Sequence, residues 1–293
     1  MNSIIRHNRK ARAFTIIELL TVMSIIVILI GLLVPALNRV RIYAKTVRQK
    51  AQFHSMEAAI ELFNNEFDGY PPSSAFDRPT GDPTGQPRSY CGAMKLCEAL
   101  MGRDLLGFHP NSAFRQDNTD LTGQNLVYMS TPNNLRARKG PFLPLESANA
   151  YQLLDIYGSG KTGSFPQDLY VLCDVFTRQV PTGEKVGMPI LYYKADTTGG
   201  LHDPNVASTP FDNRGNIYNY WDNMEILGLG KPGDPQFKHN LADKTVFYAA
   251  IRSDKIKTPP RPYRDSGYIL ISAGYDGEYG TADDVYNFDW KAR

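Results

Sequence analysis

A short segment near the C-terminus concentrates side chains that could bind a metal ion. Residues 272–285 contain the acids Asp276, Glu278, Asp283 and Asp284 together with three glycines. Carboxylate oxygens on a flexible, glycine-shaped loop suit Ca²⁺ far better than zinc or copper, although the spacing is not that of an EF-hand. From these residues alone, a calcium loop and a turn with solvated acids are equally good interpretations.

A single acid, Glu18, stands beside a long apolar run and could pair with a cation. Residues 19–37 carry no charge. A carboxylate at the centre of a bilayer costs about 2.5–3.5 kcal/mol, and less near the interface, so such an acid is expected to have a partner. The alternative is an interfacial acid whose side chain simply reaches the water.

Two other features suggest chemistry but are better explained without it. Residues 158–162 read GSGKT, yet Asp155 replaces the glycine that opens a phosphate-binding loop, and Pro166 follows where a helix is needed. We therefore expect a turn there. The five histidines are scattered without a metal-binding spacing, and 32 basic against 30 acidic residues leave no electrostatic footprint for nucleic acid.

The apolar run is long enough to cross a membrane. As a helix, residues 19–37 span about 29 Å, close to the hydrocarbon core of roughly 30 Å. Residues 1–13 contain four basic side chains and no acid, which places the N-terminus in the cytoplasm and the body outside. A cleaved secretory signal has a shorter apolar core of about 7–15 residues. An uncleaved signal anchor explains the length and orientation but not Glu18.

The residues around this acid resemble a known processing motif. Residues 13–20, AFTIIELL, are similar to the site in type IV pilins and type II secretion pseudopilins where a small residue precedes a Phe-Thr-aliphatic-aliphatic-Glu run. The resemblance implies that a prepilin peptidase cuts between Ala13 and Phe14 and methylates the new amine. It also implies that Glu18 then meets the N-terminus of a neighbouring subunit. The family usually has glycine where this chain has Ala13.

The acidic loop extends the resemblance to the other end of the chain. Its Ser-x-Gly-x-Asp-Gly…Asp-Asp-aliphatic order is similar to the C-terminal calcium loop of the major pseudopilin. The resemblance implies a structural Ca²⁺ bound by Asp276 and by one or both of Asp283 and Asp284. Backbone carbonyls, such as those of Ala273 and Val285, would complete the shell. Calcium would stiffen a loop that has few apolar residues of its own.

The chain as a whole predicts an α+β fold. A long N-terminal helix over residues 14–67 is transmembrane at 19–37 and amphipathic afterwards. Its apolar face includes Val47, Ala51, Leu62 and Phe63 and extends to Phe67. It packs on a small antiparallel sheet decorated by a large loop-rich insertion. We expect short helices at residues 92–101 and near 220–227, and strands at residues 189–194, 245–251 and 268–272.

These segments give the expected domain organisation. A basic leader of residues 1–13 is removed, the long helix follows, and residues 68–293 form a pilin-like globular domain. Within that domain the insertion covers about residues 70–240 and the calcium loop residues 272–285.

The sequence thus predicts a structural filament subunit and not an enzyme. The expected partners are a prepilin peptidase, other pilin or pseudopilin subunits, an inner-membrane assembly platform and, before assembly, membrane lipid, but no nucleic acid. The subunit would cross the bacterial inner membrane once, with its body in the periplasm or outside the cell. A secretion pseudopilin and a pilus pilin remain equally open. The rival class is a signal-anchored periplasmic enzyme or carbohydrate-binding protein that keeps its leader.

Overall fold

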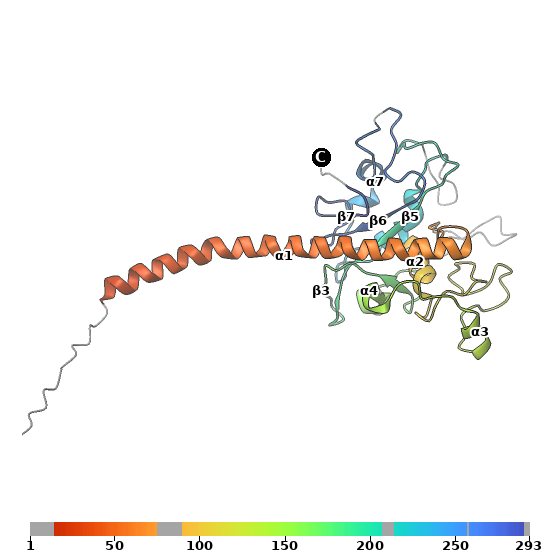
Figure 1. Cartoon of the computed structure of the whole chain (residues 1–293), viewed down its shortest axis with the longest axis horizontal. Coiled ribbons are helices and arrows are strands. Elements are labelled where there is room, and N and C mark those ends of the chain that lie inside the picture. The colour runs from red at the N-terminus through yellow and green to blue at the C-terminus, as the bar shows by residue number, and fades with distance from the viewer. Residues whose placement is uncertain (1–14, 75–89, 207–213, 257, 290–293) are drawn as a thin grey trace, which may run out of the picture. The chain divides into compact units, whose positions relative to one another are not determined.

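The computed structural model describes residues 15–74, 90–206, 214–256 and 258–289. Its contacts divide the chain into two compact units, Met1–Ala44 and Lys45–Arg293, which are described separately. The leader, Ala13 and Phe14 lie outside the described residues. Helices and strands carry the labels of Figure 1.

The first unit consists of the beginning of a long helix, α1, which in full covers Ile16–Phe67. Side chains from residue 16 to residue 41 are exposed, and the helix is long and apolar enough to cross a membrane. Thr21 and Ser24 donate their hydroxyls to the carbonyls of Ile17 and Leu20, each at 2.8 Å. These polar groups are therefore satisfied within the helix, as a bilayer requires.

In the second unit, the remainder of α1 packs on the body through one face. Its buried residues are Gln49, Gln52, Phe53, Met56, Ala59, Ile60 and Phe63. The packed face expected from the sequence is confirmed at Phe63, which is buried, and is wrong at Val47, Ala51 and Leu62, which are exposed. Two glutamines replace them at the interface: Gln49 accepts a hydrogen bond from the Val175 amide at 2.9 Å, and Gln52 donates to the Cys173 carbonyl at 3.0 Å.

A three-stranded antiparallel sheet lies at the centre of the body (Figure 1). Its strands are β5 (Leu191–Lys194), β6 (Tyr268–Ser272) and β7 (Val285–Tyr286), in the order β5-β6-β7. The expected strands at 189–194 and 268–272 are confirmed. Every residue of β6 is buried, as expected for a central strand covered on both faces.

Short elements make up the rest of the body. They are α2 (Gly92–Met101), α3 (Pro132–Ala137), α4 (Leu145–Ala148), β1 (Ala150–Gln152), α5 (Leu153–Tyr157), β2 (Tyr170–Leu172), β3 (Arg178–Gln179), β4 (Lys185–Val186), η1 (Tyr220–Asn223), α6 (Met224–Leu227), η2 (Asn240–Ala242) and α7 (Lys244–Ala250). β1 pairs with β2 and β3 with β4, both antiparallel. The helices predicted at 92–101 and 220–227 are confirmed.

The strand predicted at residues 245–251 is wrong, because this segment forms helix α7. Asp243 caps it by accepting a hydrogen bond from the Thr245 amide at 2.7 Å. Phe247 and Ile251, four residues apart and both fully buried, lie on one face of the helix. Local β-propensity was outweighed by this cap and by the burial of one helical face.

Two hydrophobic clusters form the core. One contains residues of α1 (Phe53, Met56, Ile60 and Phe63) together with Leu270 of β6. The other contains the opposite faces of β5 and β6 with α6 and α7. All ten residues of α2 are buried, so part of the range 70–240 contributes to the core. The structure is thus the predicted mixed α+β fold, with a long helix on a small antiparallel sheet.

Candidate assembly and calcium sites

Glu18 lies in the first turn of α1, where it forms a capping box with Thr15. The Thr15 amide and hydroxyl both donate to Glu18 Oε2 at 2.8 Å, and the Glu18 amide donates to Thr15 Oγ1 at 3.3 Å. A Thr-x-x-Glu spacing is the sequence signal for such a box, so Thr15 could have been found from sequence. The box holds the carboxylate at the positive end of the helix dipole, four residues after Phe14 in the sequence.

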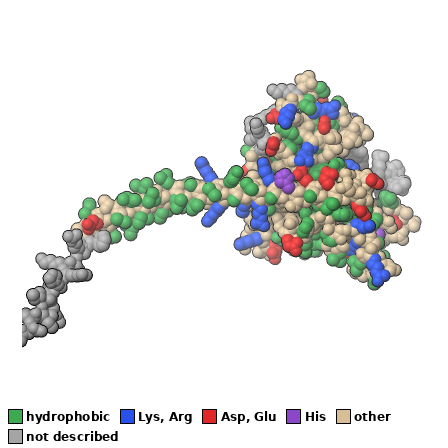
Figure 2. All heavy atoms as spheres, in the orientation of Figure 1, with side chains coloured by type: hydrophobic (Ala, Val, Ile, Leu, Met, Phe, Trp, Pro, Cys, Tyr) green, Lys and Arg blue, Asp and Glu red, His purple; other side chains and the backbone are tan. Residues whose placement is uncertain are grey.

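The apolar run beyond Glu18 presents an unbroken hydrophobic surface. None of its side chains is buried in the part of the chain that the structure describes, and hydrophobic side chains cover this part of α1 in Figure 2. After Glu18, the next acid along α1 is Glu57. Glu18 is therefore the one acid that α1 offers at the edge of a membrane span.

The acidic segment forms the connection between β6 and β7. Ser272 pairs with Val285 at its base. Gly274 has φ 63°, and a side chain there would collide with the Asp283 carbonyl; Gly277 has φ 69°, and a side chain there would collide with the Arg178 guanidinium. Left-handed backbone is strained for most other residues. These glycines therefore permit the fold of the loop.

Two of the three predicted metal ligands lie together. The Asp276 amide donates to Asp283 Oδ2 at 3.0 Å, and the Thr281 hydroxyl donates to Asp283 Oδ1 at 2.7 Å. Burial and then the neighbouring Asp283 charge raise the pKa of Asp276. Burial opposes the ionisation of Asp283, but these hydrogen bonds hold its pKa below the usual range. A cation would relieve the repulsion between the two carboxylates.

Asp284 is the third predicted ligand and is almost fully buried. Its Oδ2 accepts hydrogen bonds from the Gly280 amide at 2.8 Å and the Tyr286 hydroxyl at 3.1 Å. Its Oδ1 is buried without a hydrogen-bond partner among the described residues. Burial raises the pKa of Asp284 to about 8. An unpartnered buried carboxylate oxygen is a position that a cation would satisfy.

A cation bound at this loop would have few carboxylate ligands. Over residues 15–74, 90–206, 214–256 and 258–289, no three His, Cys, Asp or Glu side chains gather as a ready metal cluster. The remaining ligands would have to be backbone carbonyls or water, which calcium accepts readily. Glu278 does not join the acids; it forms an ion pair with Lys231 at 3.6 Å.

A buried tyrosine and an arginine hold the loop in place, and neither could be recognised from the sequence pattern. Tyr279 is 2% exposed, and its hydroxyl donates to the Pro189 carbonyl. Arg178, which is distant in sequence, donates to the Asp276 carbonyl at 3.3 Å. The expectation that the loop lacks apolar support of its own is therefore wrong, because Tyr279 inserts into the core.

The GSGKT segment forms a turn, as predicted. It follows α5, and the buried Thr162 hydroxyl donates to the Phe165 carbonyl at 2.9 Å. The segment is not followed by a helix whose amides could hold a phosphate.

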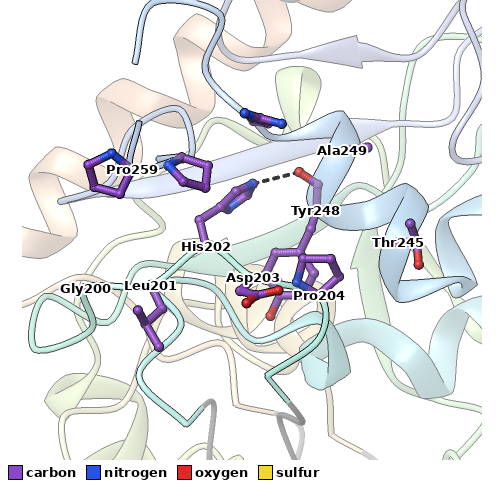
Figure 3. A pocket seen from close by; sticks show the side chains of 11 residues that line it. Gly200, Leu201, His202, Asp203, Pro204, Thr245, Tyr248, Ala249 and Pro259 are labelled. Atoms are coloured by element: carbon purple, nitrogen blue, oxygen red, sulfur yellow. Dashed lines mark hydrogen bonds between the residues drawn. The ribbon is translucent and has the colours of Figure 1, made fainter. Parts of the chain in front are cut away.

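A pocket of about 490 Å³ lies on the body between α7 and residues 200–204 (Figure 3). His202 lies within it, and its Nε2 is 2.8 Å from the Tyr248 carbonyl. A carbonyl only accepts, so Nε2 carries the proton. Burial lowers the pKa of His202 to about 4. A neutral histidine with its proton committed to the backbone is a weak general base at neutral pH, so the arrangement is better explained by packing.

One comparison with known proteins gives a match, and it falls on the assembly site. Residues 8–34 match the prokaryotic N-terminal methylation motif. The match contains the Ala13–Phe14 bond, Glu18 and most of the apolar run. No curated protein and no solved structure matches the chain. With its apolar α1 fit to anchor it once in a membrane, the chain carries the N-terminal signature of the type IV pilins and pseudopilins.

Proposed function

We propose that the protein is a structural subunit of a type II secretion pseudopilus or a type IV pilus-like filament. A prepilin peptidase would cut between Ala13 and Phe14 and methylate the Phe14 amine. The observation that carries the proposal is the methylation motif at residues 8–34, placed at the start of an exposed apolar helix. Glu18 lies at that start, with no further acid before Glu57.

Glu18 would set the register between subunits. Cleavage creates a cationic amine on Phe14 in an apolar setting, where an unpaired charge costs several kcal/mol. The carboxylate of Glu18 in an adjacent subunit offsets that charge. Thr15 orients the carboxylate through two hydrogen bonds to Oε2. Oε1 has no hydrogen-bond partner among the described residues and could therefore meet a neighbouring subunit.

The apolar part of α1 would exchange lipid for the helices of neighbouring subunits. An inner-membrane platform and its assembly ATPase would drive this transfer. Beyond the span, α1 keeps apolar residues exposed, with Val47 at 51% and Leu62 at 54% of their possible surface. They give the helix a second face with which to meet other subunits while its buried face holds the body.

The methylation motif at residues 8–34 supports an inner-membrane location with the leader in the cytoplasm. Basic residues both precede the span and follow it, so their count alone does not set the orientation. The body, Lys45–Arg293, would then fold in the periplasm and become part of the filament outside.

Calcium would stabilise the loop between β6 and β7. Asp276, Asp283 and Asp284 would hold it, with backbone carbonyls such as those of Ala273 and Val285. The support is the pair of adjacent carboxylates and the unpartnered Oδ1 of Asp284. The ion would supply positive charge to this acidic loop. The loop's own Tyr279 anchors it to the Pro189 carbonyl, and Arg178 binds it from outside.

We propose no catalytic role for the body. The pocket that would serve an anchored enzyme contains a histidine whose Nε2 proton is bound by a backbone carbonyl. The methylation motif at the N-terminus favours assembly over catalysis.

Zero-length carbodiimide cross-linking of assembled subunits tests the pairing directly, because it joins only carboxylates and amines in contact. We expect an intersubunit bond between Glu18 and the Phe14 amine, identified by mass spectrometry of the dimer. Glu18→Gln should abolish it, whereas Glu146→Gln, at an exposed acid of the body, should not.

An internal control shows that the reagent works in each variant. Lys139 and Glu66 form an ion pair at 2.9 Å within one chain, so their cross-link should appear throughout. If that link forms while Glu18 joins no neighbouring subunit, the proposed assembly contact is wrong.

A further inference from the structure

Beyond its apolar run, α1 carries a concentration of positive charge. Arg39, Arg41, Lys45, Arg48 and Lys50, which we call the basic collar, fall within twelve positions, and α1 has no acid between Glu18 and Glu57. Lys45 is half-buried and the other four side chains are exposed. In Figure 2, Lys and Arg side chains project from the helix just beyond its hydrophobic part.

No acidic side chain in the described part of the protein neutralises the charge of the collar. Across residues 15–74, 90–206, 214–256 and 258–289, none of its five members forms an ion pair or hydrogen bond with another side chain. Five like charges on one stretch of helix repel one another. A partner of opposite charge would offset that repulsion.

The collar's position along α1 matches the edge of a bilayer. With a rise of about 1.5 Å per residue, Arg39 lies about 3 Å and Arg41 about 6 Å beyond Leu37, the last residue of the apolar run. The headgroup layer is roughly 5–8 Å thick on each side. Lys45, Arg48 and Lys50 follow at about 12–20 Å, within one to two Debye lengths of that layer, and their long side chains can reach back towards it.

The arrangement around the helix favours lipid over a protein partner. At about 100° per residue, Arg39 and Arg41 are about 200° apart and fall on opposite sides of α1. A protein surface would contact one side only, whereas headgroups surround a helix where it leaves the hydrocarbon.

A tyrosine within the collar independently indicates the same environment. Tyr43 is 70% exposed and lies between Arg41 and Lys45. Tyrosine is enriched where a spanning helix passes from hydrocarbon to water, because its ring is apolar and its hydroxyl is polar.

We propose that the basic collar binds the anionic phospholipid headgroups of the leaflet that faces the body, and so holds the unassembled subunit at a fixed depth. This rests on the membrane insertion that the proposed function requires, but not on leader cleavage or filament assembly. The bonds are charge-assisted contacts from guanidinium and ammonium groups to phosphate. Each basic residue near an anionic surface strengthens binding about fivefold.

Lipid binding to the full chain tests the proposal. The chain is reconstituted in nanodiscs of seven parts phosphatidylcholine to three parts phosphatidylglycerol, and the lipids that it retains are counted by native mass spectrometry. We expect wild type to retain phosphatidylglycerol in preference to phosphatidylcholine, and to lose that preference in high salt. The variant R39Q/R41Q/K45Q/R48Q/K50Q should show at least a fivefold lower preference.

Two controls separate collar charge from other effects. R136Q/K161Q/K185Q/K244Q/K255Q removes five exposed basic residues of the body and should behave as wild type. R39K/R41K/R48K keeps the charge and should retain the lipid, which shows that substitution at these positions leaves insertion intact.

Three results would overturn the proposal. They are equal retention of both lipids by wild type, unchanged retention by the glutamine variant, and an equal loss in the body control. Loss of filament incorporation with unchanged lipid retention would assign the collar to contacts between subunits instead. A chain that keeps its leader would refute the proposed processing and leave this lipid result standing.

Discussion

Glu18 has one observed role and one proposed role, and a substitution can separate them. It caps α1 through Thr15, and in the proposed filament it neutralises the amine of a neighbouring Phe14. Glutamine can form the same capping box as glutamate but carries no charge. The two roles therefore respond differently to glutamine and to alanine.

We predict that Glu18→Gln and Glu18→Ala both leave membrane insertion and leader cleavage intact and both abolish filament incorporation. Lost charge is the cause in each case, and alanine additionally removes a cap interaction of about 1 kcal/mol. Incorporation is measured by recovery of the subunit in sheared filaments. Normal incorporation of Glu18→Gln would mean that the acid serves only as a cap.

The calcium loop makes a second residue-scale prediction. Asp276→Ala should remove most of the calcium-dependent rise in melting temperature, because it deletes one of two adjacent carboxylates. Chelation of wild type should lower the melting temperature to a similar value. Glu278→Ala, at the acid paired with Lys231, is the matched control and should keep the calcium response. Identical melting curves with calcium and with chelator in wild type would rule out the site.

The raised pKa of Asp284 predicts how the stability of the metal-free body depends on pH. Its pKa is about 8 in the folded protein and about 4 in an unfolded chain. The folded state therefore keeps a proton that the unfolded state loses, so the Asp284 contribution to stability falls as pH rises from about 4 to about 8 and is constant above that.

Asp284→Asn removes this dependence. In chelator at pH 8 the variant should melt at least about 3 °C above wild type, the shift expected for roughly 1 kcal/mol in a domain of this size, and the difference should shrink towards pH 4. With calcium the order should reverse, because the variant loses a ligand. A constant difference across this pH range would show that Asp284 does not titrate as described.

At the scale of elements, α1 shows what the sequence could predict and what it could not. Its length and the position of its apolar run were readable because charge is absent from residues 19–37. Its packed face was readable only in part. Phe63 was expected there and is buried, but Gln49 and Gln52 are buried by bonds to the distant backbone at Val175 and Cys173. Such partners become visible only when the chain is folded.

The same limit explains the other errors. The segment of helix α7 was predicted as a strand from its local propensity. The tertiary packing of Phe247 and Ile251 outweighs that propensity and makes it a helix. The acids of the loop between β6 and β7 could be listed from the sequence, and their binding of calcium stays a prediction. Arg178 and Tyr279, which hold that loop, could not be recognised, since their partners lie 98 and 90 residues away in sequence.

Two adjacent residues of α1 test its orientation on the body. Phe63 is 4% exposed, with its ring centroid 5.1 Å from that of Phe108, whereas Leu62 is 54% exposed. Phe63→Ala should lower the free energy of unfolding by about 3–5 kcal/mol, and Leu62→Ala by less than about 0.5 kcal/mol. Urea unfolding of the full chain in detergent measures both. A larger effect at Leu62 would place the opposite face of α1 against the body.

At the scale of the whole molecule, the two units have different physical requirements. The body, Lys45–Arg293, contains its own clusters of buried side chains. The described part of the first unit buries none of its apolar run and needs lipid or other helices around it. This division is what a filament subunit requires, because it must first reside in a membrane and later leave it.

Positive charge is concentrated on both sides of the apolar run. The basic leader precedes the span, and the basic collar follows it. Removal of the leader would leave Glu18 and the new amine as the only charges before the span. Processing would thereby convert a positively charged cytoplasmic end, which the membrane potential retains, into one that is nearly neutral.

The intact mass of the mature chain isolated from cells tests this account most directly. We predict a mass that corresponds to residues 14–293 plus one methyl group on Phe14, and a mass that still includes residues 1–13 in cells without an active prepilin peptidase. A mature protein that begins at Met1 in normal cells would contradict the account, because the amine that Glu18 is proposed to neutralise would never form.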